Sequence, residues 1–255
     1  MLVSLAGLTV DIEHPSSYTR DYCAAYLAPQ GARADFSVSV SPEEILREGE
    51  VTPETPLGYL ETLALYRKIC ERALAYDIFL FHGSALTLDG EGVLFTAPSG
   101  TGKSTHASLW RQVFGERVTM VNDDKPLLAV KENGVTVSGT PWDGKHRLST
   151  PVTAPLRAIC FLRRRETNSI RPLSPRDALP ALLRQSYRPQ DPALVEKTLS
   201  LLTRLLTLVP CYLLSCNMDA EAARVACDGI FPRDPKLEPF PSAVGASNPR
   251  KGELP

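Results

Sequence analysis

The chain has 255 residues, enough to bury a full hydrophobic core as one large domain. Its 28 Lys and Arg residues nearly balance 29 Asp and Glu residues, so no broad attraction to nucleic acid or to an acidic membrane is expected. The longest apolar run, Leu199 to Val209, contains Arg204 and is too short to span a bilayer. The apolar start lacks a basic leader, and the six cysteines form no C-x-x-C pair. We expect a cytoplasmic protein.

Residues 1–76 carry signals for strands followed by one packing helix. Apolar alternation predicts strands near Val3–Ile12 and Phe36–Val40. Apolar residues at helical spacing predict a helix over Leu57–Tyr76. Nothing in residues 1–50 points to catalysis.

The next apolar run, from Ile78 to Leu88, ends at Asp89-Gly90, the dipeptide that closes a tight hairpin. A second apolar run follows at residues 93–95. A hairpin directly before this strand predicts a mixed sheet rather than a purely parallel one. His82 lies in the first run, and a lone histidine near a strand is more typical of a structural role than of catalysis.

The stretch from Gly92 to Thr105 has the layout of a phosphate-binding loop. A buried strand leads into a glycine-rich turn whose N–H groups can face an anion, and the helix that follows aims its positive end at the same place. Ala97 stands where the G-x-x-x-x-G-K-[ST] motif has its first glycine, but the strand–loop–helix order favours nucleotide binding over a chance turn. The predicted nucleotide-binding residues are Ser99, Gly100, Thr101, Gly102, Lys103, Ser104 and Thr105.

The hydrophobic run after the loop helix, residues 118–122, ends in Asp123 and Asp124. An acid at the end of a strand beside the loop strand is where a Mg²⁺ ion on the nucleotide needs a carboxylate. Neighbouring side chains on a strand point to opposite faces, so the two acids share one site only if the strand has begun to turn. The alternative is a turn cap before Pro126.

Two later segments are candidates for substrate contact. Glu132-Asn133-Gly134 predicts a second hairpin, after which residues 139–147 form a loop rich in glycine and charge. Its candidate substrate contacts are Asp143, Lys145 and Arg147, although surface turns have similar compositions. A strand is expected over Leu156–Leu162, and Arg163–Arg165 follow it directly. These arginines are either a solvated strand end or a contact for a phosphate.

The remaining chain predicts helices, one strand and a tail. Helix starts are expected at Ser174-Pro175 and Asp191-Pro192, where a capping side chain precedes a proline. Tyr212–Leu214 predicts a buried strand, and a last helix is expected between Asp219 and Gly229. Residues 233–255 have no period and predict a flexible tail.

Three elements in this order, Phe81-His82-Gly83-Ser84-Ala85, Ser99–Thr105 and Asn122-Asp123-Asp124, resemble the HPr kinase/phosphorylase and phosphoenolpyruvate carboxykinase superfamily. The similarity covers residues 78–125. It implies a P-loop, carboxykinase-like α/β fold with a mixed sheet and flanking helices. One domain would span 1–232, with N-terminal strands and a helix at 1–76 and the nucleotide-binding core at 77–232.

The resemblance also implies roles for single residues. Lys103 and Ser104 would bind phosphate and Mg²⁺, and His82 would line the transfer site with Asp123 and Asp124. The chain lacks the glycine-rich signature of HPr kinases and the long substrate domains of the carboxykinases. Relatives of HPr kinase include enzymes that phosphorylate a serine on a ribosomally made peptide.

We therefore predict an ATP- and Mg²⁺-dependent kinase that moves the γ-phosphoryl group to a hydroxyl, namely a serine of a peptide or small protein. The predicted catalytic residues are His82, Lys103, Asp123 and Asp124, and Ser104 and Asp124 are assigned to the metal. The division of roles between the two acids stays open, as does a homo-oligomeric state. The alternatives are a small-molecule kinase and a nucleotide-binding module with vestigial turnover.

Overall fold

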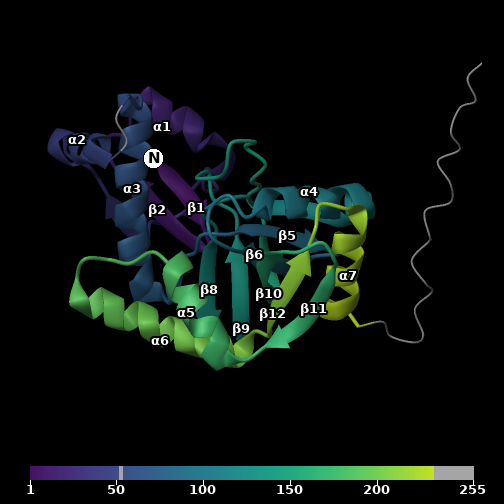
Figure 1. The fold of residues 1–255 in the computed structure, drawn as a ribbon. Coiled ribbons are helices and arrows are strands. Elements are labelled where there is room, and N and C mark those ends of the chain that lie inside the picture. The colour runs from purple at the N-terminus through teal and green to yellow at the C-terminus, as the bar shows by residue number, and fades with distance from the viewer. Residues whose placement is uncertain (52–53, 233–255) are drawn as a thin grey trace, which may run out of the picture.

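The computed structural model describes residues 1–51 and 54–232. This part of the chain forms an α/β fold in which a curled mixed sheet is flanked by helices (Figure 1). The segment 233–255, predicted to be a flexible tail, lies outside the described residues.

The first part of the chain, here called the N-terminal unit, is a small sheet with helices. Its strands are β1 (Leu2–Leu5), β2 (Leu8–Ile12) and β3 (Phe36–Val38), and its helices are α1 (Ser17–Tyr22), η1 (Ala24–Tyr26), α2 (Pro42–Val51), α3 (Leu57–Ala73) and η2 (Leu74–Tyr76). The single strand predicted over Val3–Ile12 is wrong, because the chain turns back at Ala6 and Gly7, whose φ angles are 52° and 83°. The helix predicted over Leu57–Tyr76 is confirmed.

Within residues 54–232, nine strands form the second sheet, in the order β4-β8-β9-β10-β6-β5-β7, with β12 beside β10 and β11 beside β12. They are β4 (Ile78–Leu80), β5 (Ser84–Leu88), β6 (Glu91–Thr96), β7 (Val118–Asn122), β8 (Leu127–Lys131), β9 (Gly134–Ser138), β10 (Thr153–Arg164), β11 (Ser169–Leu173) and β12 (Cys211–Cys216). β6 pairs antiparallel with β5 and parallel with β10, so the predicted mixed sheet is confirmed.

The long strand β10 produces the curl of the sheet. Its first residues, Thr153–Pro155, pair antiparallel with β9, and residues 156–161 pair in parallel with β6. The register shifts between Leu156 and Ala158, and such a bulge lets one strand bend from one part of a sheet into another. The carboxyl ends of β6, β10 and β12 consequently lie at the same edge.

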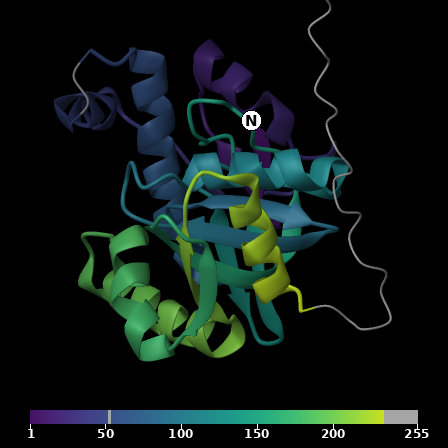
Figure 2. The ribbon, with the colours of Figure 1, turned by 45° about the vertical axis from the view of Figure 1, so that its right-hand side comes forward.

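Helices cover both faces of this sheet. They are α4 (Lys103–Phe114), followed by the turn η3 (Gly115–Arg117), α5 (Pro175–Gln185), α6 (Pro192–Leu208) and α7 (Ala220–Ile230). Val93 and Phe95 of β6 pack in the core with α4 and α7, whereas Leu94 packs in the core with α5 and α6. Figure 2 shows α4 and α7 together on one side and α5 with α6 on the other.

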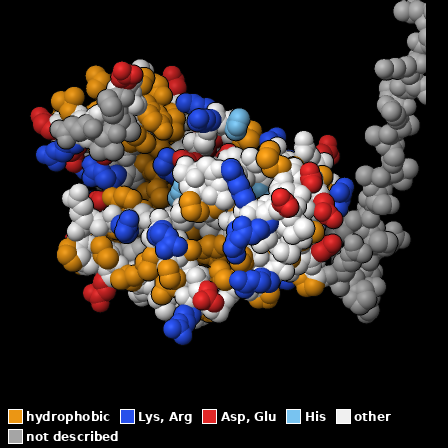
Figure 3. All heavy atoms as spheres, viewed as in Figure 1, with side chains coloured by type: hydrophobic (Ala, Val, Ile, Leu, Met, Phe, Trp, Pro, Cys, Tyr) orange, Lys and Arg blue, Asp and Glu red, His pale blue; other side chains and the backbone are white. Residues whose placement is uncertain are grey.

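A third core joins the N-terminal unit to the large sheet. Ile78 of β4 and Leu127 of β8 are buried in it together with residues of β1–β3 and α3. On the outside of the unit, Figure 3 shows hydrophobic side chains over α2 and α3. Leu46 of α2 and Leu57 of α3 are exposed. No helix in the described ranges has the length and apolarity needed to cross a membrane.

Local signals in the sequence account for most turns and helix ends. Asp89 and Gly90 both have positive φ in the hairpin between β5 and β6, as predicted. The predicted helix starts at Ser174 and Asp191 are confirmed, and each of these side chains accepts a backbone N–H of the first turn. Gly115 ends α4 with a φ of 56°.

The final helix ends differently from the prediction. Gly229 was expected to end it, but α7 continues to Ile230. A Cβ at Gly229 would lie 2.4 Å from Cγ2 of Ile170, so the glycine permits close packing of α7 on β11. Strand β11 itself was not predicted, because its edge position leaves it without a continuous apolar pattern.

Candidate nucleotide-binding and transfer site

The turn between β6 and α4 has the shape that the sequence predicts for a phosphate-binding loop. Gly100 and Gly102 adopt φ angles of 75° and 115°, which only glycine accepts without strain. The turn is therefore compact, with Thr101 N–H donating to the Pro98 carbonyl over 3.2 Å. The unpaired N–H groups of the first turn of α4 remain available to an anion.

Lys103 lies at the start of α4 with its side chain buried beside this turn. Its ammonium donates to the Ala97 carbonyl over 3.0 Å, which ties the end of the loop to its beginning. Burial lowers the pKa of Lys103, and the nearby Asp124 and Asp123 act in the opposite direction. An anionic ligand at the loop would replace the missing hydration of this ammonium.

The two acids follow β7 in a turn organised by Asn122. The fully buried Asn122 accepts the backbone N–H groups of Asp124 at 2.8 Å and Lys125 at 2.6 Å. Its amide donates to oxygens of Thr140 and Trp142 in the loop between β9 and β10. The strand has thus begun to turn at the acids, which is the condition under which both side chains face one site.

Asp123 is the more deeply buried of the two acids. Its Oδ1 accepts the hydroxyl of Ser84 on β5 over 2.7 Å. A Cβ at Gly144 would lie 3.2 Å from its Oδ2, so this glycine lets the 139–147 loop approach the carboxylate closely. Within the described residues Oδ2 has no hydrogen-bond or ion-pair partner.

Asp124 lies between two basic side chains. Its Oδ1 is 3.3 Å from Nε2 of His82, and its Oδ2 is 2.6 Å from the ammonium of Lys125. Burial raises the pKa of Asp124, but the His82 hydrogen bond and the charges of Lys125 and His82 outweigh it and lower the pKa to about 2. This carboxylate is ionised at neutral pH.

His82 has a partner on each ring nitrogen. Nδ1 lies 2.8 Å from Oε1 of Gln185, at the end of α5, and Nε2 faces Asp124. The backbone is held as well, since His82 N–H donates to the Gln185 carbonyl over 2.7 Å and Gly83 N–H to the Asp124 carbonyl over 3.1 Å. The imidazole is thus held between Gln185 and Asp124.

The loop at 139–147 and the N-terminal unit form the wall of the site that lies opposite the glycine-rich turn, here called the far wall. The guanidinium of Arg147 lies over the ring of Tyr22, 5.2 Å from its centroid. Trp142 stacks on Tyr66 of α3 at 4.0 Å, and the Tyr66 hydroxyl donates to the Lys125 carbonyl over 2.7 Å. The N-terminal unit therefore supports the acid turn as well as the far wall.

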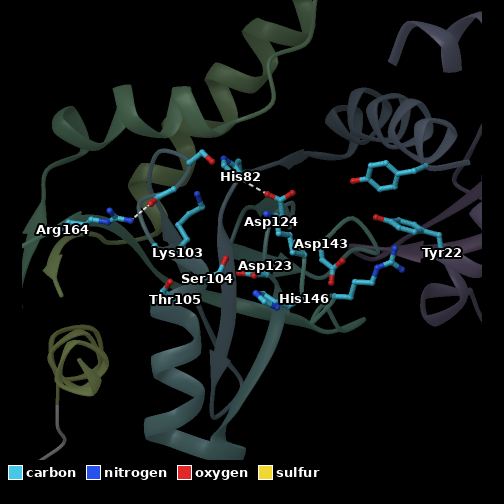
Figure 4. A pocket seen from close by; sticks show the side chains of 17 residues that line it. Tyr22, His82, Lys103, Ser104, Thr105, Asp123, Asp124, Asp143, His146 and Arg164 are labelled. Atoms are coloured by element: carbon cyan, nitrogen blue, oxygen red, sulfur yellow. Dashed lines mark hydrogen bonds and ion pairs between the residues drawn. The ribbon is translucent and has the colours of Figure 1, made fainter. Parts of the chain in front are cut away.

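The glycine-rich turn, the two acids, His82 and the far wall all contribute residues to one cavity of about 690 Å³, here called the loop pocket (Figure 4). Every predicted site residue except Thr101 lines it: the loop residues Ser99, Gly100 and Gly102 to Thr105, then His82, Asp123, Asp124, Asp143, Lys145 and Arg147. It is also lined by Tyr22, Tyr59, Gly144, His146 and Arg164. Figure 4 shows Arg164 and Tyr22 at opposite ends, with Lys103 and the acids between them.

The family model of the SynChlorMet cassette protein ScmC matches residues 54–222. The chain belongs to the ScmC family. A comparison with curated proteins finds no match. Among solved structures, the Hpr(Ser) kinase/phosphatase from Coxiella burnetii is similar with a TM-score of 0.36 and 14% identity, over 59% of this chain and 95% of that one. A likeness this weak supports no conclusion about the ScmC-family chain.

The donor set of this ScmC-family site suits a hard divalent cation. Ser104, Asp123 and Asp124 offer a hydroxyl and carboxylate oxygens, the ligands that Mg²⁺ takes together with phosphates and water. In the described ranges no three His, Cys, Asp or Glu side chains cluster as an all-protein metal site. The residues therefore fit a cation that arrives with a phosphate ligand.

Several lining residues were not predicted from the sequence. Tyr22 and Tyr59 come from the N-terminal unit, where nothing pointed to catalysis, and no local motif marks them. Arg164 was left open between a solvated strand end and a phosphate contact. It donates from Nε to the Thr101 carbonyl over 2.9 Å and from its Nη2 to the Gly100 carbonyl. The signal for Arg164 in the sequence was its position at the end of a predicted strand. In the structure this strand, β10, pairs with β6, which leads into the glycine-rich turn.

Proposed function

We propose that this ScmC-family protein is an ATP-dependent phosphotransferase that moves the γ-phosphoryl group to a hydroxyl, namely a serine of a peptide or small protein. One observation carries the proposal: a phosphate-binding loop, two carboxylates and a histidine line the same pocket. These are the parts that phosphoryl transfer requires, because its catalysis consists of positioning and charge stabilisation.

The loop and Lys103 would hold the β- and γ-phosphates. The N–H groups at the start of α4 point their dipoles at the phosphates, and the Lys103 ammonium adds a charge that is poorly hydrated. Mg²⁺, when bound, neutralises charge on these phosphates. The residues that would hold it are Ser104 and one of the two acids.

The contacts of the two acids support Asp123 as the ligand of Mg²⁺, whereas the sequence analysis assigned Asp124 to the metal. Both oxygens of Asp124 already face basic side chains, and a metal ion there would have to displace Lys125 or His82. Asp123 has only the neutral Ser84 hydroxyl on one oxygen. Asp123 and Ser104 also line a second cavity together, on the α4 side of the loop pocket.

Asp124 would then serve the acceptor. The hydroxyl oxygen of the acceptor forms a bond to the γ-phosphorus, the bond from that phosphorus to the β–γ bridging oxygen breaks, and ADP leaves. Asp124 accepts the hydroxyl proton, and His82 keeps this carboxylate oriented. A carboxylate with a low pKa is a weak base, which suffices where the proton leaves late in a loose transition state.

The acceptor would enter between Tyr22, Tyr59 and the 139–147 loop. This end lies away from Arg164 and is built from two separate parts of the chain (Figure 4). Lys145 and Arg147 line it and form no ion pair within the described residues, so they are available to a polar acceptor chain. An opening of this kind supports a peptide more than a small molecule that would be fully enclosed.

The test is transfer to a defined acceptor. The protein is incubated with ATP, Mg²⁺ and the small proteins encoded beside it, and the products are analysed by mass spectrometry. We expect one phosphoryl group on a serine, abolished by Lys103→Ala and retained in Lys131→Ala, whose exposed ammonium bonds to the Tyr76 carbonyl. Binding of ATP without transfer to any hydroxyl would identify a binding module instead, and transfer to a metabolite a small-molecule kinase.

A further inference from the structure

Another cavity adjoins the loop pocket on the side away from the acids. This outer pocket, of about 800 Å³, is bounded by the start of α4, by residues 164–167 at the end of β10 and by residues 216–218 at the end of β12. It shares Gly102, Thr105 and Arg164 with the loop pocket. The two cavities therefore meet at the loop itself.

This arrangement fixes the orientation in which a polyphosphate binds to the loop. Of the loop pocket and the outer pocket, only the loop pocket is lined by His82, Asp123 and Asp124, so the phosphate that is transferred has to lie on that side. Figure 4 shows Arg164 on the side of Lys103 that faces away from Asp123 and Asp124. The opposite end of the phosphate chain, where a nucleotide carries its sugar and base, leaves the loop at Thr105 and Arg164.

The wall of the outer pocket has the chemistry that a flat aromatic ring requires. Met218 is 75% exposed, an unusual exposure for a large apolar side chain, and its thioether is of the kind that packs on aromatic faces. Arg164 and Arg165 bring planar guanidinium groups, which stack on bases. Thr105 and Thr167 add hydroxyls for a polar edge.

The buried inner side of this wall contains His106, a neutral histidine with one N–H group that has no partner within the described residues. His106 is buried, and its Nε2 accepts the indole N–H of Trp110 over 3.1 Å, so its hydrogen lies on Nδ1. Burial lowers the pKa of His106 to about 4, which keeps the ring neutral. Nδ1 is buried and has no hydrogen-bond partner in the described part of the chain.

The wall is held together before any ligand arrives. The N–H of Asn217 donates to Oδ1 of Asn168 over 2.9 Å, and its side-chain amide donates to the Glu166 carbonyl over 3.0 Å. Arg165 N–H donates to the Cys216 carbonyl over 3.0 Å. These bonds join the segment after β10 to the loop after β12. Little conformational entropy is therefore lost when a ligand binds in the outer pocket.

We infer that the outer pocket binds the nucleoside of the nucleotide whose phosphates occupy the loop, with Met218 and Arg165 packed against its base. The inference rests on the proposed function, because it places the half of the donor substrate that the loop does not hold. It means that the protein selects a nucleoside triphosphate rather than any polyphosphate.

Calorimetry with ATP and with inorganic tripolyphosphate, both with Mg²⁺, tests the inference. Stacking of one base is sufficient for about a tenfold preference, so the wild type should bind ATP at least that much more tightly than tripolyphosphate. Met218→Ser should remove most of this preference and leave the tripolyphosphate affinity unchanged. Because Met218 is exposed, the variant should keep the wild-type melting temperature.

The control is Leu199→Ser, which changes another exposed apolar residue, on α6, and should alter neither affinity. Equal affinity of the wild type for ATP and tripolyphosphate would overturn the inference while leaving the phosphate-binding loop intact. A parallel loss of both affinities in Met218→Ser would overturn it as well. Failure of the wild type to bind either compound would overturn the proposed function, and the inference with it.

Discussion

Asp124 shows how one charge is stabilised by its surroundings at the scale of a residue. Its side chain is 27% exposed, and its pKa is lowered from an ordinary value of 3.8 to about 2. A carboxyl whose pKa is depressed in the folded state contributes stability above its ordinary value and loses it as the pH falls through the folded value. The contribution of ionised Asp124 corresponds to about 2 kcal/mol.

We therefore predict that Asp124→Asn is less stable than the wild type near neutral pH by about 2 kcal/mol, and that this gap closes between about pH 4 and about pH 2. Urea unfolding of both proteins across this range measures the gap. Asp89→Asn is the control, because Asp89 is 55% exposed in its pair with Arg117 and should give a smaller gap. A gap that does not change with pH would contradict the assignment of the charge.

His82 allows three roles that differ in their pH dependence. A cationic role loses activity as the pH rises and the ring loses its proton, a metal-ligand role loses it as the pH falls, and a structural role changes neither. Both ring nitrogens already have partners, so coordination of a metal would require breaking the contact with Asp124 or Gln185. We expect His82 to act on Asp124 at the transfer site rather than on a metal ion.

The prediction is that the transfer activity of His82→Gln is lower than that of the wild type by about 10²-fold, because Asp124 loses the partner that orients it. A pH–rate series for both proteins measures this, with melting temperatures determined alongside. Superimposable profiles accompanied by a large drop in melting temperature would mean that His82 only holds the backbone beside α5.

At the scale of elements, Asn122 joins the turn after β7 to the loop between β9 and β10. It is fully buried and outside the loop pocket, yet both acids depend on the turn that it organises. The close approach of that loop also requires glycine, since a Cβ at Gly139 would lie 1.9 Å from the Thr150 carbonyl oxygen.

Asn122→Ala should cost about 2–4 kcal/mol of unfolding free energy, because it leaves several buried backbone groups without partners. Activity should fall further than the loss of folded protein explains, since the acid turn loses its shape. Denaturant unfolding and transfer activity per folded molecule measure the two effects. Thr207→Ala, which removes an exposed hydrogen bond to the Arg204 carbonyl, is the control and should have a small effect on both.

At the scale of the molecule, strand β8 of the large sheet contributes side chains to two cores, one of which includes the N-terminal unit. Leu127 and Ala129 of β8 point into the core with the N-terminal unit, whereas Leu128 and Val130 point into the core under α5 and α6. A strand that serves two cores couples them, because neither core can be exposed without breaking the other. We expect the described chain to unfold as one unit.

The two tryptophans of the chain report on this coupling separately. Trp110 lies behind the phosphate-binding loop and Trp142 lies against α3. Trp110→Phe leaves only the signal of Trp142, and Trp142→Phe leaves only that of Trp110. Within each variant, the fluorescence midpoint in urea should coincide with the midpoint from circular dichroism. Distinct midpoints would show that the N-terminal unit unfolds on its own.

The sequence alone determined the features that depend on neighbouring residues. The glycine-rich turn before Lys103, the Asp89-Gly90 hairpin and the capped starts of α5 and α6 follow from backbone preferences that act over a few residues. The mixed sheet followed from the same local evidence, because a tight hairpin forces its two strands to be antiparallel.

Only the tertiary structure decided which distant residues meet. Gln185 reaches His82 from the end of α5, Ser84 reaches Asp123 from another strand, and Tyr22 meets Arg147 across more than half of the described chain. These contacts depend on strand order and on the curl of β10, which arise from the packing of whole elements. Hydrophobic periodicity tells which face of an element is buried but not which partner covers it, so the far wall of the loop pocket carried no signal in the sequence.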